Sequence, residues 1–363
     1  MANVVFDKRI NPAGGGKLRQ SNIEALRLLS MLMVLNLHSF WGYDNGSGIL
    51  QAFDFLREST SICAVNAFLL ISGYFGIKWK FKSFFNLIFQ LFFYAFGVYV
   101  IAVSLGYVDF SNKEFLMNAT CIYNHWGFIT AYVLLYMLSP MLNALSEKLT
   151  SKDLLLTIII LYISELFITR DCGSLNYGIL YLIGRFIKKT DAVNRLQTVA
   201  VRGYWFTTVL IFAFVYGAYK LLLIDDADGM CGFLLGYSYS GPFVILQAVF
   251  LFLTFARINF TSKFINWCSA SCLSIFLIHM HPSIKHIGYY SLTESLYDLP
   301  VLQHIGVLLL LIISVFFGCI LIDKIRIIIS DAVYFLLCKI KQLLPQKIFE
   351  FETYIPSVVK KLI

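Results

Sequence analysis

The stretch NIEALRLLSMLMVLNLHSF, Asn22 to Phe40, has the length and apolar character of a helix that crosses a membrane. It nevertheless contains Glu24, Arg27 and His38. Ionisable side chains inside a bilayer are costly, and those that occur there usually face protein or a water-filled cavity and mark a functional site. The stretch therefore predicts a membrane-spanning helix and a candidate site on that helix.

The composition of the whole chain is typical of a membrane protein. Of its 363 residues, 59% are hydrophobic and only 14% are charged, whereas about 25% of the residues of a soluble domain are charged. Because lipid leaves no water to satisfy the backbone, such apolar runs form helices. We expect an all-α polytopic membrane protein, a bundle of about ten transmembrane helices. The expected spans are residues 21–41, 59–77, 83–107, 127–145, 154–169, 176–187, 203–223, 241–256, 264–280 and 301–322.

The net charge of +8 indicates topology rather than nucleic-acid binding, because the basic residues are concentrated in alternate loops and the terminal segments, and the other loops are poor in Lys and Arg. By the positive-inside rule these parts and both termini are cytoplasmic. We therefore expect a multi-pass protein of the plasma (inner) membrane. The basic residues of these parts include Lys8, Arg9, Lys17, Arg19, Lys78, Lys80, Lys82, Lys188, Lys189, Arg195, Arg202, Arg257, Lys263, Lys324, Arg326, Lys339 and Lys341. The opposite loops carry Asp44, Asp54, Glu58, Asp225, Asp226 and Asp228.

The chain divides into three predicted parts. Residues 1–20 form a cytoplasmic leader, 21–323 the transmembrane domain and 324–363 a cytoplasmic tail. No cleavable signal peptide is expected, because the first span lacks a small-residue cleavage site. The tail mixes apolar residues with lysines, which suits an amphipathic helix on the membrane surface, and a frayed tail is an equal alternative. The outer loops at 108–125, 224–240 and 281–300 are expected to have no structure of their own.

The eight cysteines show neither a CxxC pair nor metal-ligand spacing, so no metal site is predicted. Cys121, Cys172 and Cys231 fall near the outer side. One disulfide among them and three reduced thiols are both compatible with the sequence. His279 and His281 are two residues apart and do not share a helical face, which argues against a joint metal site.

The charged residues of the first span share one face of the expected helix. Arg27 and His38 are eleven residues apart, which is three turns plus about 20° and a distance of about 16 Å along the axis. Glu24 lies three residues before Arg27, within reach of an ion pair. We expect this face to line a cavity within the protein. The alternative is an ion pair at the cytoplasmic headgroups and a histidine that reaches the outer interface.

These residues resemble the signature of the acyltransferase-3 family of membrane-bound acyltransferases, in which an acidic residue, two others, Arg, ten others and His occur in the first span. The resemblance extends from about residue 20 to residue 323. Later segments follow in the family's order: VNAFLLISGYFGI (Val65 to Ile77), HWGFITAYVLLYMLSPML (His125 to Leu142), YLIGRFIKK (Tyr181 to Lys189) and LSIFLIHMHP (Leu273 to Pro282). This chain departs from the family in having Tyr74 where Phe is frequent, and in lacking the outer hydrolase-like domain that some members carry.

The resemblance implies O-acyl transfer, most often of acetyl, from a cytoplasmic acyl-CoA to a hydroxyl of a cell-surface sugar or polysaccharide. No permanently bound cofactor is expected, since acyl-CoA is a substrate. His38 is the candidate general base, because imidazole exchanges protons near neutral pH. Arg27 could bind a phosphate of coenzyme A or stabilise charge on the thioester oxygen. Glu24 would orient Arg27.

Further candidates have structural alternatives of similar weight. For substrate binding they are Asn66, Ser72, Tyr74, Trp126 and His279. Asn66 could equally be structural, Ser72 and Gly73 could serve close helix packing, and Trp126 could anchor the interface. Arg185 and Lys82 are candidates for coenzyme A, although cytoplasmic anchoring explains such residues equally well. Transfer could be direct or could pass through an acyl-enzyme on Ser72, Tyr74 or a cysteine.

Two other classes of protein compete with an acyltransferase. A transporter or flippase would also have about ten spans with charged residues inside, but it predicts broken helices in matching halves of the chain, and the prolines show no such pattern. A polysaccharide polymerase or ligase predicts a large Arg-rich outer loop, which is missing from this sequence. Neither the acceptor nor the state of self-association follows from the sequence.

Overall fold

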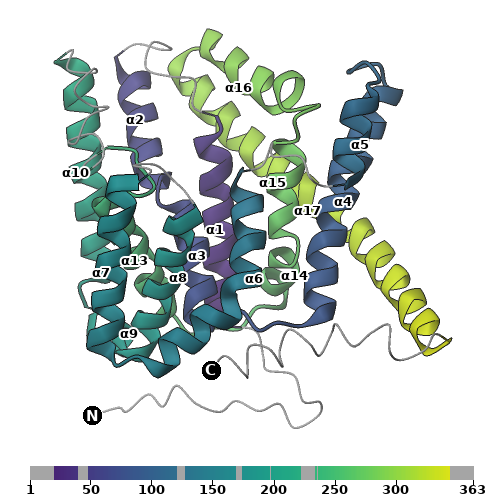
Figure 1. Ribbon diagram of the computed structural model, residues 1–363. Helices are drawn as coiled ribbons and strands as arrows, with labels where there is room; N and C mark the ends of the chain where they lie inside the picture. Colours follow the sequence, from purple (N-terminus) through teal and green to yellow (C-terminus); the bar gives the residue numbers. More distant parts are fainter. Residues whose placement is uncertain are drawn as a thin grey trace.

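A computed structural model describes residues 20–39, 48–120, 127–168, 174–196, 198–221, 234 and 236–343. It is 84% helical, and the described residues form no strand. The prediction of an all-α protein is confirmed. Figure 1 shows most of the helices standing side by side, with α1 in the middle of the bundle and the C-terminal half of α17 leaving it at an angle.

Each predicted span falls on a helix, except that the second is divided between α2 and α3 and the ninth between α14 and α15. The helices are α1 (Ser21–Leu37), α2 (Ile49–Ser61), α3 (Ala64–Phe75), α4 (Phe81–Ser104), α5 (Asn112–Thr120), α6 (Gly127–Lys148), α7 (Ser151–Ile168), α8 (Ser174–Lys189), α9 (Ala192–Leu196), α10 (Ala200–Lys220), α13 (Pro242–Ala256), α14 (Lys263–Ser269), α15 (Cys272–His279), η1 (His286–Tyr290), α16 (Ser291–Glu294), η2 (Ser295–Asp298) and α17 (Val301–Leu343).

Five helical segments of the described chain are long and apolar enough to cross a membrane. They are Ile49–Phe75, which joins α2 to α3, Phe81–Ser104, Gly127–Lys148, Ala200–Lys220 and Val301–Ile340. The shorter α13 is also apolar. These helices indicate an integral membrane protein. The count of about ten crossings and the cytoplasmic position of the termini stay predictions.

Three segments expected to be loops are helical. Asp54 and Glu58 lie in α2, and Asp54 is buried rather than exposed in an outer loop. The reason is that Asp54 forms an ion pair with Arg57 one turn later, and this pairing allows the carboxylate to be buried. Outer segments 108–125 and 281–300 contain α5 and the short helices η1, α16 and η2. Helical turns satisfy the backbone of a connection that packs against the bundle.

At the other end of the chain, α17 continues without a break past Asp323, the expected end of the transmembrane domain. Much of the predicted tail, residues 344–363, lies outside the described residues.

The closest packing of two helices is between α3 and α8, and it depends on glycine. A Cβ atom added at Gly73 would lie 2.0 Å from the backbone oxygen of Tyr181, and one added at Gly184 would lie 2.5 Å from the backbone oxygen of Leu70. Backbone therefore meets backbone at this crossing, as small residues permit between membrane helices. The expectation that Gly73 admits a neighbouring helix is confirmed.

We predict that Gly73→Ala lowers stability, because the added methyl forces the α3 and α8 backbones apart. Overpacking of this kind costs about 1–3 kcal/mol. The matched control is Gly97→Ala in α4, where an added Cβ meets nothing within 4 Å. Alanine there should stabilise the protein by about 0.4–1 kcal/mol, because it lowers the conformational entropy of the unfolded chain. Thermal unfolding of the detergent-purified proteins measures both. Equal midpoints for the two variants would contradict the role assigned to Gly73.

Candidate functional site

The acidic and basic residues near the start of α1 form the ion pair that their spacing predicts. The Nη1 atom of Arg27 lies 3.0 Å from Oε1 and 3.2 Å from Oε2 of Glu24. The Glu24 side chain is 9% exposed and that of Arg27 is 35% exposed. One nitrogen of the guanidinium is thus fixed by the carboxylate, while part of the group stays accessible to a ligand.

Helices α14 and α15 run alongside α1 in the same direction and fix its register. At the start, Ser21 Oγ donates to Asn266 Oδ1 at 3.1 Å. One turn or more later, Cys272 Sγ contacts the Arg27 backbone oxygen at 3.3 Å. At the far end His38 meets His279. These three contacts, low, middle and high on α1, place the two histidines at the same level.

The two imidazoles are joined by a hydrogen bond that determines where their protons lie. His38 Nδ1 is 2.8 Å from His279 Nε2, and His279 Nδ1 is 2.5 Å from the Ile275 backbone oxygen. A carbonyl oxygen only accepts, so His279 carries its proton on Nδ1 and, as a neutral ring, accepts at Nε2. His38 must then donate from Nδ1. This leaves Nε2 of a neutral His38 without a proton and able to act as a base.

Aromatic rings surround the pair. The ring of Tyr289 meets His279 edge-on, with centroids 5.4 Å apart, and Phe276 lies 6.1 Å from His38 and 6.0 Å from His279. Phe128 of α6 packs in turn on Phe276 at 5.7 Å. His279 is buried and His38 is half-buried, so the solvent-accessible part of the pair belongs to His38.

Between Arg27 and His38 the shared face of α1 is filled by packed side chains. Met31 and Val34 are 4% and 5% exposed and belong to the same apolar cluster as Ile275 and Phe316. The face thus turns toward α15 and α17 within the protein, as expected. The cavity expected along it is occupied by these side chains in this structure.

The substrate-binding candidates of α3 point to different surroundings. Asn66 is fully buried and donates from Nδ2 to the Tyr239 backbone oxygen at 2.8 Å, while its Oδ1 atom has no hydrogen-bond partner. Ser72 Oγ donates to the Phe68 backbone oxygen within its own helix at 3.0 Å. The ring of Tyr74 packs on Phe252, with centroids 4.9 Å apart.

Of the remaining candidates, His279 is itself a member of the histidine pair. His279 was predicted to bind substrate, but both of its ring nitrogens are engaged by His38 and Ile275. Trp126 lies outside the described residues.

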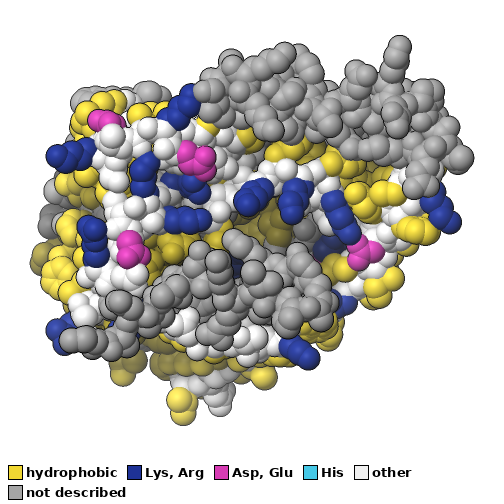
Figure 2. Space-filling view, turned by 90° about the horizontal axis from the view of Figure 1, so that it is seen from below, with side chains coloured by type: hydrophobic (Ala, Val, Ile, Leu, Met, Phe, Trp, Pro, Cys, Tyr) yellow, Lys and Arg dark blue, Asp and Glu magenta, His cyan; other side chains and the backbone are white. Residues whose placement is uncertain are grey.

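The two candidates for coenzyme A stand apart from each other. Arg185 of α8 bonds Ser146 Oγ at 2.9 Å and Glu147 Oε1 at 3.1 Å. Lys82, at the start of α4, lies 3.8 Å from Asp331 of α17. Figure 1 shows α8 and α17 on different sides of α1. Figure 2 looks at the end where α1 begins, and it shows Lys and Arg side chains spread over this face with few Asp or Glu among them.

In the described part of the chain no three His, Cys, Asp or Glu side chains are grouped to hold a metal. The cysteines predicted near the outer side, Cys121, Cys172 and Cys231, lie outside the described residues. The described cysteines are free thiols: Cys63, Cys268, Cys272, Cys319 and Cys338.

Two buried ion pairs of the structure were not predicted from the sequence. Arg57 pairs with Asp54 at 2.6 Å, and Arg326 pairs with Asp323 at 2.8 Å. Both repeat the spacing of Glu24 and Arg27, an acidic residue followed by Arg three positions later. This spacing is the sequence signal from which both ion pairs could have been predicted. The positions of Asp54 and Arg326 in the sequence were interpreted only as indicators of topology.

The family model described as an acyltransferase domain matches residues 20–324. These bounds agree with the resemblance drawn from the first-span signature and the later segments. No curated protein and no solved structure matches the chain.

We predict that ¹⁵N spectra of the histidine-labelled protein show His38 protonated on Nδ1 and unprotonated on Nε2, because His279 offers only an acceptor. His279→Phe should abolish this signature. His286→Phe is the control, since His286 is exposed and contacts Tyr290 instead. A His38 signal that carries the proton on Nε2, or one that His279→Phe leaves unchanged, would contradict the arrangement.

Proposed function

The chain belongs to the acyltransferase-3 family of membrane acyltransferases, and on that premise we propose that it transfers an acyl group, acetyl in the first instance, from a cytoplasmic acyl-CoA to a hydroxyl of a cell-surface sugar or polysaccharide. The observation that supports this reaction is the His38–His279 hydrogen bond, which leaves His38 Nε2 free to accept a proton. A neutral imidazole that donates from Nδ1 and lacks a proton on Nε2 is suited to act as a general base.

In the proposed reaction His38 Nε2 removes the proton of the acceptor hydroxyl. The hydroxyl oxygen attacks the thioester carbonyl carbon, and the carbon–sulfur bond then breaks. The coenzyme A thiolate leaves and takes the proton from the His38 imidazolium. The products are an ester and free coenzyme A, and His38 returns to its starting form. His279 accepts from His38 Nδ1 both before and after Nε2 takes the proton, and it is therefore a positioning residue.

Arg27 has a different role, which its distance from His38 decides. The two side chains start about 16 Å apart along α1, so Arg27 cannot stabilise an oxyanion that forms beside His38. A phosphate of coenzyme A is the better partner for its accessible guanidinium nitrogens. The Lys and Arg residues on the same end of the molecule (Figure 2) would attract the same anionic head.

A donor that reaches from Arg27 to His38 must move the side chains between them. Met31 is unbranched and flexible, which makes it the side chain best suited to give way. Binding of the donor would then open a path that is filled in the structure described here. Direct transfer is the simpler route, because the hydroxyl of Ser72 bonds within α3 and the ring of Tyr74 packs on α13.

We predict that His38→Ala lowers kcat by about 10²–10⁴-fold, the usual contribution of a general base, and removes the acyl mass from surface glycans. Mass spectrometry compares cells with the intact gene, a deletion, His38→Ala and the control His286→Ala, all expressed at equal levels. If the acyl mass requires the gene but survives His38→Ala, His38 is not the base. If no glycan changes in the deletion, a sugar or polysaccharide acceptor is wrong.

We also predict that Arg27→Gln raises the KM for acyl-CoA with little change in kcat, because it removes a charge that binds the donor away from the reacting atoms. Steady-state kinetics on the protein in lipid nanodiscs, with acyl-CoA varied, measures the effect. Lys113→Gln serves as the control, since Lys113 is an exposed residue of α5 to which no binding role has been assigned. A fall in kcat with unchanged KM for Arg27→Gln would instead place Arg27 at the thioester.

A further inference from the structure

We propose that Arg57 is a positioning residue for His38, holding the backbone on both sides of this histidine so that Nε2 points at the acceptor hydroxyl. The proposal rests on the proposed role of His38 as the general base. Neither the first-span signature nor the candidate residues drawn from the sequence include Arg57, which lies on the neighbouring helix α2.

The first step of the argument is that α1 ends at Leu37, immediately before His38. The last carbonyl groups of a helix lack partners within the helix. Arg57 donates to one of them and to a carbonyl just beyond the helix: Nη1 donates to the Asn36 backbone oxygen at 2.7 Å, and Nη2 donates to the Ser39 backbone oxygen at 2.9 Å. One guanidinium therefore fixes a carbonyl before His38 and a carbonyl after it.

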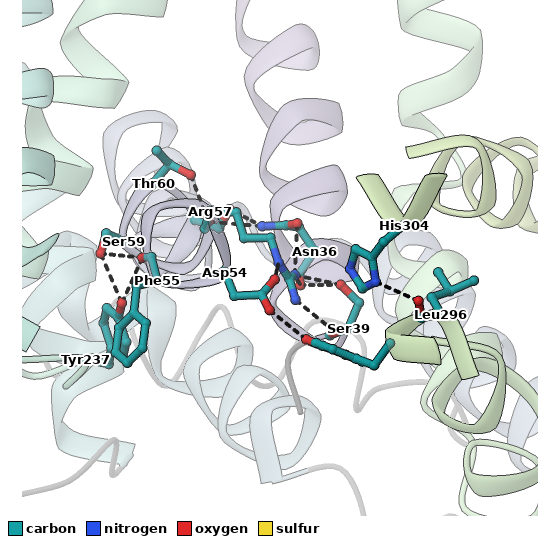
Figure 3. A network of polar contacts seen from close by, with 12 residues as sticks. Asn36, Ser39, Asp54, Phe55, Arg57, Ser59, Thr60, Tyr237, Leu296 and His304 are labelled. Carbon is teal, nitrogen blue, oxygen red and sulfur yellow. Dashed lines mark hydrogen bonds and ion pairs between the residues drawn. The ribbon is translucent and has the colours of Figure 1, made fainter. Parts of the chain in front are cut away.

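Side chains reinforce this connection, as Figure 3 shows. Arg57 Nη1 also donates to Ser39 Oγ at 2.8 Å and contacts Asn36 Oδ1 at 3.2 Å. In return, Asn36 Nδ2 donates to the Arg57 backbone oxygen at 3.0 Å and to Ser61 Oγ at 2.9 Å. The end of α1 and the middle of α2 are thus joined by hydrogen bonds in both directions.

Arg57 is itself held in place and is shielded from any ligand. Asp54 Oδ1 accepts from Arg57 Nε at 2.6 Å, and Tyr297 donates to Asp54 Oδ2 at 2.9 Å. The side chains of Arg57 and Asp54 are 6% and 2% exposed. The pair is buried and its charges are balanced, which excludes Arg57 as a residue that binds the donor directly. Its hydrogen bonds act on the protein backbone.

A second contact fixes the same turn from the opposite side. Tyr289 donates from its hydroxyl to the Leu35 backbone oxygen at 2.7 Å, and its ring packs edge-on against His279. The turn Leu35–Ser39 is thereby held at three carbonyl groups. A displacement of 1 Å in a catalytic group can cost about 10²-fold in rate. Loosening this turn should therefore displace His38 and lower kcat.

The chain offers a matched control for Arg57. Arg326 is buried, pairs with an acidic residue three positions earlier, and its partner Asp323 accepts a hydrogen bond from Tyr94 at 2.8 Å. Its hydrogen bonds are made to Asp323 within α17, at 2.8 and 2.9 Å. Arg57→Lys and Arg326→Lys thus disturb similar buried pairs, and only the first touches the α1 turn that carries His38.

The experiment measures kcat, the KM for acyl-CoA and thermal stability of Arg57→Lys, Arg326→Lys, His38→Ala and the double variant Arg57→Lys/His38→Ala in nanodiscs. We expect Arg57→Lys to lower kcat by about 10²-fold with unchanged KM, and Arg326→Lys to leave kcat within a few-fold. The double variant should be no slower than His38→Ala, because residues that act as a unit are not additive. Tyr297→Phe, a milder change, should lower kcat in the same direction if Arg57→Lys accumulates poorly.

Three results would overturn the proposal: an unchanged kcat in Arg57→Lys, equal losses in Arg57→Lys and Arg326→Lys, or a further loss when Arg57→Lys is added to His38→Ala. Full activity of His38→Ala would instead reject the proposed base. In that case the ¹⁵N signal of His38 decides the positioning separately. Loss of the Nδ1-protonated signature in Arg57→Lys supports it, and an unchanged signature contradicts it.

Discussion

A polar side chain in an apolar bundle must find its partner within the protein, and this constraint shapes the centre of the structure. Three arginines meet it in the same way, each pairing with an acidic residue one helical turn earlier: Glu24–Arg27, Asp54–Arg57 and Asp323–Arg326. The spacing that brings each pair together is local to one helix, and the two buried pairs gain further hydrogen bonds from Tyr297 and Tyr94 of other helices. They differ in exposure, and this difference separates their uses. The Arg27 side chain is 35% exposed, whereas the other two arginine side chains are each 6% exposed.

The histidines show how the same constraint can yield reactivity. His38 and His279 come from helices that run in parallel, and each provides a hydrogen-bond partner for one ring nitrogen of the other. The Ile275 carbonyl sets the proton of His279, which in turn sets that of His38. Arg57 and Tyr289 donate to backbone carbonyls of the turn Leu35–Ser39, and these hydrogen bonds fix the orientation of the His38 ring. Catalytic groups perform best when their supporting residues hold them to within about 0.5 Å.

The sequence was sufficient for the features that depend on local spacing and composition. The apolar runs predicted the positions of the helices, three-residue spacing predicted the Glu24–Arg27 pair, and Gly73 predicted a close helix contact. The hydrogen bond between His38 and His279 joins residues 241 positions apart, and no local rule links them. It emerges only because α14 and α15 align with α1. The burial of Asp54 was not predicted, because an acidic residue near the end of a span is also typical of an outer loop. Only its hydrogen-bond partners distinguish a buried position from an exposed one.

The end of α15 adds an electrostatic consequence. His279 is the last residue of this helix, and a helix C-terminus carries about half a negative charge from its aligned peptide dipoles. His38, at the C-terminal cap of α1, lies at a second such end. When His38 takes a proton in the proposed reaction, the new positive charge therefore appears where two helix dipoles converge, each favouring a cation by about 0.3–1 kcal/mol. The peptide backbone itself would share in stabilising the imidazolium, so that the short α15 contributes through its direction as well as through its histidine.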